Sequence, residues 1–382
     1  MDSPVTLSPS GYTLKNAVVK AAMDEMMADA SGAPTENFLK LYKHWDNVDN
    51  FITGHMMVSS DAVAFPGTTI ITDTDEFKAG MRKVREILAN STLIAQINHP
   101  GRQISPDMMQ SGKMRPVSPF EGPCLPGFPV PELLTDERLA EILEYFIKGS
   151  EILFECGFDG ISLHAAHGYL LSEVLHPKVM TDKRLDMVVE MAATLRQKYP
   201  NKIISAKLNL GDHYELDHFK KIVTRLDPIL DFVEISGGSY ADPKMTSPSP
   251  RHALFARVVE EGFNTKKIML TGGFRTKEDF DKALSVATLV GVARPYAYEN
   301  DVFGAVAEGK TLKSSRSLPL IFLMILTIWS YFTGKNFWTT INPTAVYVEE
   351  FYNITNGVEK RDKIPFGKAY KLTKDIIFPK KQ

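Results

Sequence analysis

The sequence contains few cysteines and no excess of charge of either sign. Cys124 and Cys156 are the only two cysteines in 382 residues, which excludes a disulfide framework and a cysteine cluster for zinc or iron–sulfur. The formal net charge is -2 and no dense run of Lys or Arg occurs, so we expect no nucleic-acid partner. Residues 1–12 lack the basic and then apolar pattern of a secretory signal. These absences favour a reduced, cytoplasmic, soluble catalytic domain.

The sequence also lacks an apolar run of the length that a membrane helix needs, which is about 20 residues. The longest candidate is the segment 318–333, which is interrupted by Pro319, Thr327 and Ser330 and has basic residues on both sides. Three interpretations stay open for it: buried or interfacial packing, a true membrane span, or an aberrant tail. We therefore expect residues 313–382 to form a C-terminal extension, with membrane contact through 318–333 as an open alternative, and residues 1–312 to form the main domain.

Short apolar runs alternate with longer helix-like stretches through most of the chain. Continuously apolar strands are typical of a parallel sheet buried on both faces. Eight strand–helix units within about 300 residues predict a (β/α)8 TIM barrel. A doubly wound sheet is the rival, but no G-x-G-x-x-G follows the first strand. The expected strands are Ala17–Met23, Asn50–Met57, Thr92–Asn98, Gly160–His164, Ile203–Leu210, Phe232–Ser236, Ile268–Thr271 and Leu289–Val292.

The intervening stretches have the composition of helices, and one of them is interrupted. The Pro- and Gly-rich residues 116–131 fit either an ordered excursion over the barrel or a flexible loop. The expected helices are Thr35–Asp46, Asp75–Ala89, Thr135–Cys156, Leu185–Lys198, Asp217–Leu226, His252–Gly262 and Thr276–Ser285.

The stretch from Asp159 to His176 carries most of the recognisable chemistry. His164 stands at the end of an apolar run, His167 follows three residues later, and Tyr169 comes directly after Gly168. Two imidazoles and a phenol supply hydrogen-bond donors for an anionic oxygen together with one proton donor. The H-x-x-H spacing could also indicate a metal, but no carboxylate pattern completes such a site, so we predict none.

Polar residues also follow the other expected strands, where the catalytic end of a TIM barrel lies. Gln96 can donate and accept at once, which suits the amide-like edge of a heterocycle, and Lys207 supplies a positive charge. Glycines after the last strands would let backbone N–H groups approach a phosphate that Arg294 could bind through two hydrogen bonds. Together these residues predict a site for a phosphorylated redox ring.

These motifs resemble the old yellow enzyme family, in its NADH:flavin oxidoreductase branch. The resemblance covers about residues 5–308. It is most specific at Gln96 with His99-Pro100-Gly101-Arg102, at Asp159-Gly160 with His164 to Tyr169, and at Gly291 with Arg294-Pro295.

The resemblance implies an FMN-dependent NAD(P)H oxidoreductase that reduces electron-poor alkenes such as α,β-unsaturated carbonyls. His164 and His167 would bind the substrate oxygen, and Tyr169 would protonate Cα after hydride moves from flavin N5 to Cβ. It also implies that FMN is held in the barrel mouth by Ala21, Ala22, Met23, Asp24, His55, Gln96, Lys207, Gly238, Gly272, Gly273, Ala293 and Arg294.

The chain departs from the family pattern at three places. Asp24 stands where relatives usually have Thr, Ser or Cys, and His55 where this branch more often has Asn. We expect Asp24 either to lower the flavin potential or to be held protonated by its neighbours. The connection from His176 to Lys183 is also shorter than in relatives. The shortening leaves an alternative function open, that of a catalytically impaired flavin-binding or interaction protein. The sequence does not determine the substrate, the choice between NADH and NADPH, or the oligomeric state.

Overall fold

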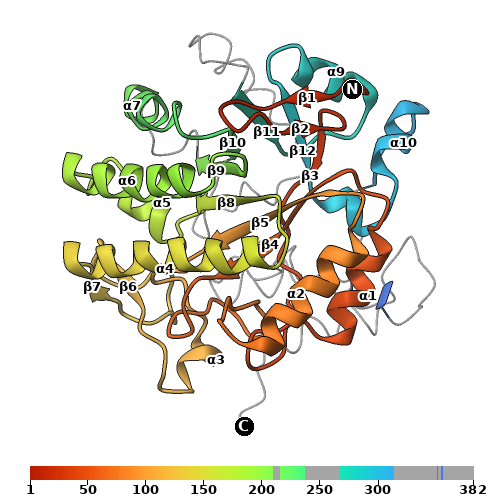
Figure 1. The fold of residues 1–382 in the computed structure, drawn as a ribbon. Coiled ribbons are helices and arrows are strands. Elements are labelled where there is room, and N and C mark those ends of the chain that lie inside the picture. Colours follow the sequence, from red (N-terminus) through yellow and green to blue (C-terminus); the bar gives the residue numbers. More distant parts are fainter. Residues whose placement is uncertain (210–215, 237–266, 314–350, 352–353, 356–382) are drawn as a thin grey trace, which may run out of the picture.

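Eight parallel strands close into a barrel surrounded by helices, as Figure 1 shows. The computed structural model describes residues 1–209, 216–236, 267–313, 351 and 354–355. Around the barrel the strands follow the order β10-β11-β12-β3-β4-β5-β8-β9, which confirms the predicted TIM barrel. The strands are β3 (Val18–Lys20), β4 (Asn50–Met57), β5 (Thr92–Asn98), β8 (Gly160–Ala165), β9 (Ile203–Asn209), β10 (Phe232–Ser236), β11 (Ile268–Thr271) and β12 (Leu289–Val292).

The first barrel strand is shorter than its apolar sequence predicts. The Ala21 N–H still donates to the Val292 carbonyl at 2.8 Å, but the chain then leaves the sheet. The Asp24 carboxylate accepts the Met26 N–H at 3.2 Å, and Met26 has a φ of 51°. A side chain that accepts a backbone N–H two residues on forms an Asx turn. Residues 21–24 therefore form a loop at the end of the barrel where we expected the end of a strand.

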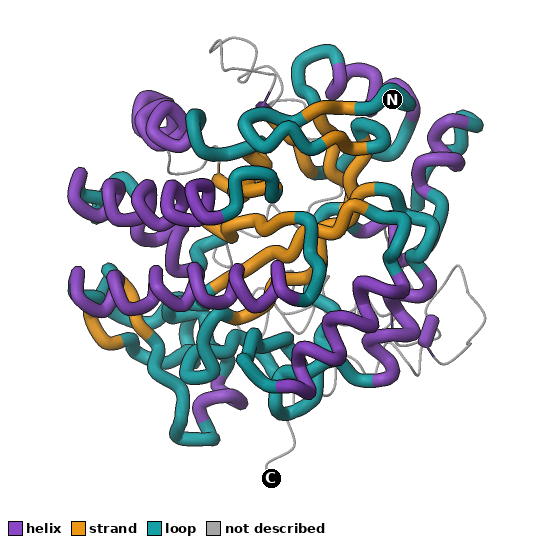
Figure 2. Tube along the Cα trace, in the orientation of Figure 1, coloured by secondary structure: helices purple, strands orange, loops and turns teal. Residues whose placement is uncertain are grey.

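The helices lie outside the strands, as the purple segments of Figure 2 show. Five of them begin after a threonine whose hydroxyl accepts a backbone N–H of the first turn, which is a favourable N-cap. The Thr181 cap starts α6 three residues before the expected Leu185. The helix expected at 252–262 lies outside the described residues. The helical segments are α1 (Glu36–His44), α2 (Asp75–Ile87), α3 (Pro106–Met109), α4 (Asp136–Glu155), α5 (Leu170–Val174), α6 (Asp182–Lys198), α7 (Leu216–Leu226), α9 (Lys277–Leu284), the 3-10 helix η3 (Arg294–Ala297) and α10 (Val302–Ala307).

The N-terminal end of the barrel is filled by an apolar layer. A small hairpin of β1 (Val5–Thr6) and β2 (Thr13–Leu14) adds Leu7 and Leu14 to this layer. Strand β8 contributes Gly160, where an added Cβ would lie 2.5 Å from the Ile203 Cβ, so only glycine fits. The barrel strands contribute Val19, Ile52, Ile94, Ile203, Phe232, Met269 and Leu289.

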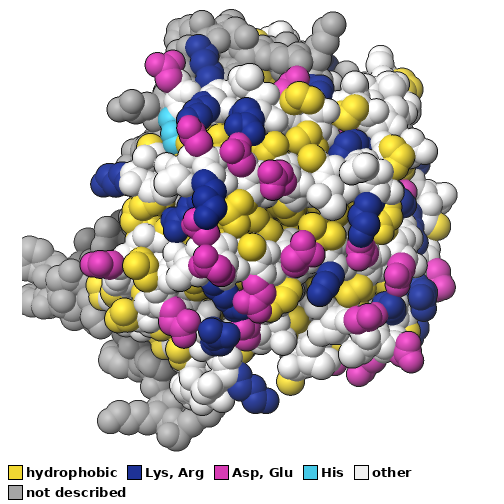
Figure 3. Space-filling model, turned by 60° about the vertical axis from the view of Figure 1, so that its left-hand side comes forward, with side chains coloured by type: hydrophobic (Ala, Val, Ile, Leu, Met, Phe, Trp, Pro, Cys, Tyr) yellow, Lys and Arg dark blue, Asp and Glu magenta, His cyan; other side chains and the backbone are white. Residues whose placement is uncertain are grey.

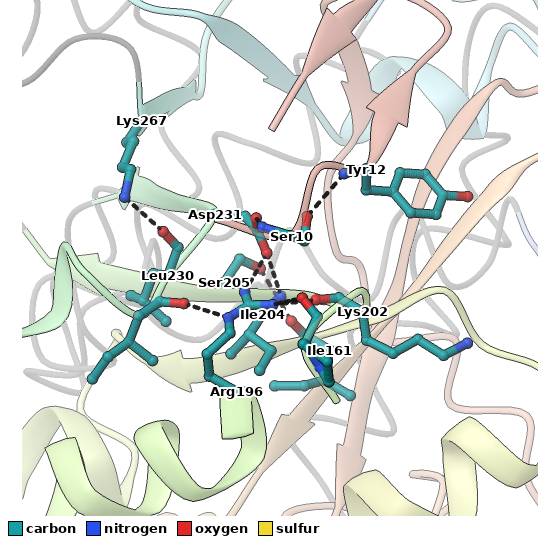
Figure 4. A network of polar contacts seen from close by, with 12 residues as sticks. Ser10, Tyr12, Ile161, Arg196, Lys202, Ile204, Ser205, Leu230, Asp231 and Lys267 are labelled. Atoms are coloured by element: carbon teal, nitrogen blue, oxygen red, sulfur yellow. Dashed lines mark hydrogen bonds and ion pairs between the residues drawn. The ribbon is translucent and has the colours of Figure 1, made fainter. Parts of the chain in front are cut away.

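A buried aspartate ties several segments together beside this layer. Asp231 is completely buried and accepts hydrogen bonds from the Ser10 and Ile204 N–H groups, both at 2.9 Å. Its carboxylate also pairs with the Arg196 guanidinium at 2.6 Å, and Figure 4 shows this network. Since charged groups persist in a protein interior only when they are paired and hydrogen-bonded, we assign this network a structural role.

A further pair of short strands flanks the Pro- and Gly-rich excursion. Strands β6 (Val117–Ser118) and β7 (Glu132–Leu133) pair in parallel at either end of it. The Arg102 guanidinium donates to the Gly122 carbonyl at 3.0 Å, which attaches the excursion to the loop after β5. These contacts favour an ordered excursion over a flexible loop.

The surface seen in Figure 3 carries basic and acidic side chains interspersed rather than gathered by sign.

Near the end of the main domain, the Leu312 N–H donates to the Arg275 carbonyl at 2.8 Å. Phe351, from the C-terminal extension, is buried with its ring 5.1 Å from that of Trp45. No helix within the described ranges is long and apolar enough to cross a membrane. The segment 318–333 lies outside those ranges.

Candidate active site

The barrel interior becomes polar toward the C-terminal ends of the strands. Several buried side-chain atoms in this part have no hydrogen-bond partner among the described residues. These atoms are Gln96 Nε2, Asn98 Oδ1, Ser162 Oγ, Glu234 Oε2 and Thr271 Oγ1. Most buried polar groups in folded proteins are hydrogen-bonded, and an exception calls for a water or a ligand. This end of the barrel therefore has the chemistry of a binding site.

The side chains that follow β8 form a compact aromatic cluster. The rings of His164 and Tyr169 lie 4.8 Å apart in an edge-on arrangement, and those of His164 and His167 lie 5.2 Å apart. A third imidazole, from His55 of β4, lies 5.2 Å from the Tyr169 ring. All four side chains are buried. The three residues predicted to be catalytic are thus brought together.

His164 is held in the neutral form with a defined tautomer. Burial lowers the pKa of His164 well below its ordinary value, and the nearby His167, Lys207 and His55 lower it further. The Ala166 N–H donates to Nδ1 at 3.4 Å, so Nδ1 acts as an acceptor. In a neutral imidazole the other nitrogen then carries the proton. His164 therefore presents Nε2–H as a hydrogen-bond donor.

His167 has an uncommon backbone conformation that its neighbours stabilise. Its φ of 64° lies in the left-handed region, which is rare for a residue other than glycine and often marks a functional site. The His167 N–H donates to Asn209 Oδ1 at 3.2 Å, and its carbonyl accepts from Gln103 Nε2 at 3.1 Å. The ring Nε2 lies 2.9 Å from Ser236 Oγ. The sequence analysis missed Asn209, Gln103 and Ser236 as supports, although Asn209 and Ser236 end strands β9 and β10.

Lys207 is paired with a carboxylate that the sequence analysis did not single out. Its Nζ lies 2.9 Å from Glu234 Oε1, and both side chains are buried. His164 lies beside Lys207 in the β8–β9 register, and Lys207 beside Glu234 in the β9–β10 register. An imidazole, an ammonium and a carboxylate thus form one row across three strands. The Lys207 charge is therefore balanced within the protein.

Two arginines lie near each other at the ends of β11 and β12. Burial, and then the neighbouring Arg294, lower the pKa of Arg275 to about 10, with Asp279 opposing. Gly272 and Gly273 have φ values of 122° and 81°, which leave their backbone accessible without a side chain. Ala293 and Arg294 begin η3. Two adjacent guanidinium groups in a partly buried site favour an anion such as phosphate. Gly238 lies outside the described residues.

The loop after β3 is joined to β4 by a second set of contacts. Ala21 and Met23 are buried, and Ala22 and Asp24 are partly exposed. The Asp24 carboxylate lies 3.0 Å from His55 Nε2, so the two positions at which the chain departs from the family pattern contact each other. Thr68 also donates to Asp24, at 3.2 Å. Counting the Met26 N–H, three groups thus lie within hydrogen-bonding distance of this carboxylate.

The short connection between α5 and α6 follows a helix, α5, that side-chain contacts attach to the loop after β5 and to β6. Helix α5 ends at Val174 and α6 begins at Asp182, in agreement with the short segment in the sequence. Glu173 pairs with Arg102 at 2.7 Å and accepts from Ser118 Oγ at 2.8 Å. Arg102 is therefore engaged by a carboxylate of α5. The Nδ1 of His99 accepts the Gly101 N–H at 3.1 Å, a contact that shapes the turn after β5.

A metal centre finds no support among the residues that the structure describes. Within them, no group of three or more His, Cys, Asp or Glu side chains is placed to hold a metal ion.

Comparisons with known proteins agree with this description of the barrel and its site. Residues 3–191 match the model of the NADH:flavin oxidoreductase / NADH oxidase family. The NADH-dependent flavin oxidoreductase nadA of Aspergillus parasiticus is 29% identical over 339 residues, covering 77% of this chain and 76% of that protein. The corresponding iliE protein of Hypocrea jecorina is 26% identical over 344 residues, covering 77% and 85%. The old yellow enzyme from Trypanosoma cruzi has the same fold, with a TM-score of 0.69 at 18% identity, covering 82% of this chain and 93% of that one.

A closed parallel barrel with these relatives defines a flavin-dependent oxidoreductase. By the match over residues 3–191, the chain belongs to the NADH:flavin oxidoreductase / NADH oxidase family, and its barrel has the fold of the old yellow enzymes.

Membership of this family implies FMN as cofactor and NAD(P)H as reductant, and the residues present fit FMN. The unpartnered Gln96 Nε2 can serve the polar edge of an isoalloxazine. The left-handed Gly272 and Gly273, with Arg275 and Arg294 beside each other, can serve its phosphate.

Proposed function

We propose that this oxidoreductase reduces activated C=C bonds, such as those of α,β-unsaturated carbonyls, at the expense of NADH. The observation that carries the proposal is the convergence of His164, His167 and Tyr169 after β8. A site that only transferred electrons from NADH to flavin would need no proton donor beside two oxygen-binding imidazoles. NADH is favoured over NADPH because the Aspergillus parasiticus and Hypocrea jecorina relatives described above are both named NADH-dependent.

The cofactor supplies the hydride, and the chain supplies the remaining functions. Bound FMN, once reduced by NADH, would deliver hydride to the β-carbon of the alkene. Gln96, Lys207, Gly273, Arg294 and the loop 21–24 would hold it. Gly238 belongs to the same proposed set but lies outside the described residues.

The two histidines would bind the substrate oxygen. His164 is neutral and directs a donor from Nε2, so it can stabilise negative charge that develops on a carbonyl oxygen without first losing a proton. The contact between His167 Nε2 and Ser236 Oγ engages one ring nitrogen and so helps to hold that imidazole in one orientation. The two rings together would fix the orientation of the carbonyl.

Tyr169 would protonate the α-carbon. Its ring is 5% exposed and lies against the rings of His55 and His164. Burial among imidazoles holds the phenol in one orientation, and a proton donor must be held within hydrogen-bonding reach of its target. Because the chain reaches Tyr169 through Gly168, with a φ of 79°, the turn itself directs the phenol back toward His164.

Substitution of Tyr169 by Phe tests this role. We expect the rate of enone reduction to fall about 100-fold or more, the size of a typical general-acid contribution, while NADH still reduces the flavin at the normal rate. The two half-reactions are followed separately by flavin absorbance in an anaerobic stopped-flow instrument. A variant that reduces enones as fast as the native chain would refute the assignment of Tyr169.

The rival function is that of a flavin-binding or interaction protein with impaired turnover. The short connection between α5 and α6 favours it, because α5 begins directly after Tyr169 and the connection continues from its end. In that case Tyr169→Phe would alter neither half-reaction, since the native chain itself would not reduce the enone. The same experiment therefore separates the two functions.

A further inference from the structure

Asp24, His55 and Asn98 form a chain of contacts across the ends of three successive strands. His55 Nε2 lies 3.0 Å from Asp24 Oδ2, and its Nδ1 lies 3.2 Å from the amide nitrogen of Asn98. An amide nitrogen can only donate, so Nδ1 accepts and Nε2 carries the proton that is donated to Asp24. Both ring nitrogens of His55 are thus engaged, which fixes its tautomer and its orientation.

The backbone is shaped to bring His55 into this position. The pairing of β4 with β5 shifts in register between Ile52 and His55, which is a β-bulge. Glu25, next to Asp24, accepts the Gly54 N–H of this bulge at 2.8 Å. An added Cβ at Gly54 would lie 2.0 Å from the Glu25 carboxylate, so glycine is needed there. A bulge redirects a side chain, and here the loop after β3 is attached directly to it.

His55 connects this chain of contacts to the proposed proton donor. Its ring meets the Tyr169 ring edge-on at 5.2 Å, while the His164 ring meets the same tyrosine at 4.8 Å. The phenol ring therefore packs against two imidazoles, one from β4 and one from β8, whose own rings lie 5.9 Å apart. Because Asp24 and Asn98 engage both ring nitrogens of His55, its position does not depend on the substrate that His164 would bind.

We propose that Asp24 and His55 are positioning residues that orient Tyr169 for proton transfer. Both residues differ from the family pattern, and each serves the other. His55 donates a hydrogen bond to the Asp24 carboxylate, and Asp24 fixes the ring that packs against Tyr169. The inference rests on the proposed function, because it concerns the proton donor of that reaction. The groups that face the pair are Thr68, Asn98, His164 and Tyr169.

The test compares Asp24→Ala with Asp24→Asn, first in the native chain and then with Tyr169→Phe. We expect Asp24→Ala to slow anaerobic reoxidation of the reduced flavin by cyclohexenone about tenfold, as a misplaced reacting group does. Asp24→Asn should retain most of the rate, because its amide oxygen can still accept from His55. Asp24→Ala should have no further effect on enone reduction once Tyr169 is Phe. The rate of flavin reduction by NADH, measured in each variant, separates any effect of Asp24 on FMN itself. Asp186→Ala, which removes an exposed partner of Arg225, is the matched control.

A second measurement does not depend on turnover. In protein labelled with 3-fluorotyrosine, the resonance of Tyr169, assigned by its loss in Tyr169→Phe, should shift and broaden in Asp24→Ala but not in Asp186→Ala. Thr68→Val removes one donor to Asp24 and should give a smaller change in the same direction. It serves the same purpose if Asp24→Ala does not fold.

The outcomes distinguish the positioning role of Asp24 and His55 from the proposed reduction of alkenes on which it rests. If Tyr169→Phe reduces cyclohexenone as fast as the native chain, the proposed function fails. If Tyr169→Phe is slow but Asp24→Ala reacts at the native rate, only the positioning role fails. It also fails if Asp24→Ala slows the reaction equally with and without Tyr169, since the pair would then act directly on the flavin.

Discussion

At the scale of single residues, the site depends on charges that are balanced within the protein. Lys207 pairs with Glu234, and Asp24 is surrounded by three donors. Lys207 and Asp24 could be identified from the sequence because Lys207 is a charged residue within an apolar strand and Asp24 directly follows the end of another. Their partners could not, because Glu234 is 27 residues from Lys207 and meets it only through the β9–β10 register. Sequence position alone does not reveal which strands are neighbours in a barrel.

The Lys207–Glu234 pair should be costly to break from one side. We expect Glu234→Gln to lower the free energy of unfolding by about 3 kcal/mol, because it leaves a buried ammonium without a counter-charge. Replacing both residues, with Lys207→Met and Glu234→Leu, should restore most of the loss. Urea unfolding of the FMN-free protein measures the free energy of unfolding of the single and the double variant. The control Asp186→Ala should stay within about 0.5 kcal/mol of the unfolding free energy of the native chain. A double variant whose loss equals the sum of the single ones would contradict the pairing.

At the scale of elements, the strands were more predictable than the loops between them. Strands β4, β5, β10, β11 and β12 match their predicted bounds, because a continuous apolar run is a direct sign of burial on both faces. The early end of β3 and the bulge in β4 were not predicted. Both depend on tertiary contacts, namely the Asp24 turn and the hydrogen bond from Gly54 to Glu25.

The contact between α5, β6 and the loop after β5 should make stability depend on pH through Glu173. Burial raises the pKa of Glu173 to about 7, although Arg102 and Ser118 oppose the rise. A carboxyl whose pKa is raised on folding binds its proton more tightly in the folded state, so its contribution is complete below the unfolded pKa of about 4.5 and is lost as the pH rises through 7.

The matched variant for this prediction is Glu173→Gln, which resembles the protonated side chain at every pH. Between pH 4.5 and 8 the native chain should lose about 3 kcal/mol of unfolding free energy relative to this variant. Urea unfolding at several pH values gives the difference. A difference that stays constant, or that grows in favour of the native chain at high pH, would show that the pairing with Arg102 outweighs burial.

At the scale of the whole molecule, an apolar layer closes one end of the barrel and a polar set of side chains occupies the other. The sequence was sufficient to predict this polarity, because most of its polar motifs stand at or just after the C-terminal ends of the expected strands. The packing of His55 and His164 against Tyr169 also depended on the strand order β4-β5-β8, which brings β4 near the turn after β8. The C-terminal extension gave the sequence analysis little to use, since it carries no motif.

The proposed reduction of activated alkenes is tested most directly by one measurement. This is the rate at which cyclohexenone reoxidises the flavin of NADH-reduced protein under anaerobic conditions. The purified chain should be yellow, should contain stoichiometric FMN and should be bleached by NADH. Addition of cyclohexenone should restore the flavin absorbance at a rate that rises with enone concentration and then saturates. A yellow protein that NADH bleaches and that cyclohexenone reoxidises no faster than buffer alone would contradict the proposed reduction of activated alkenes.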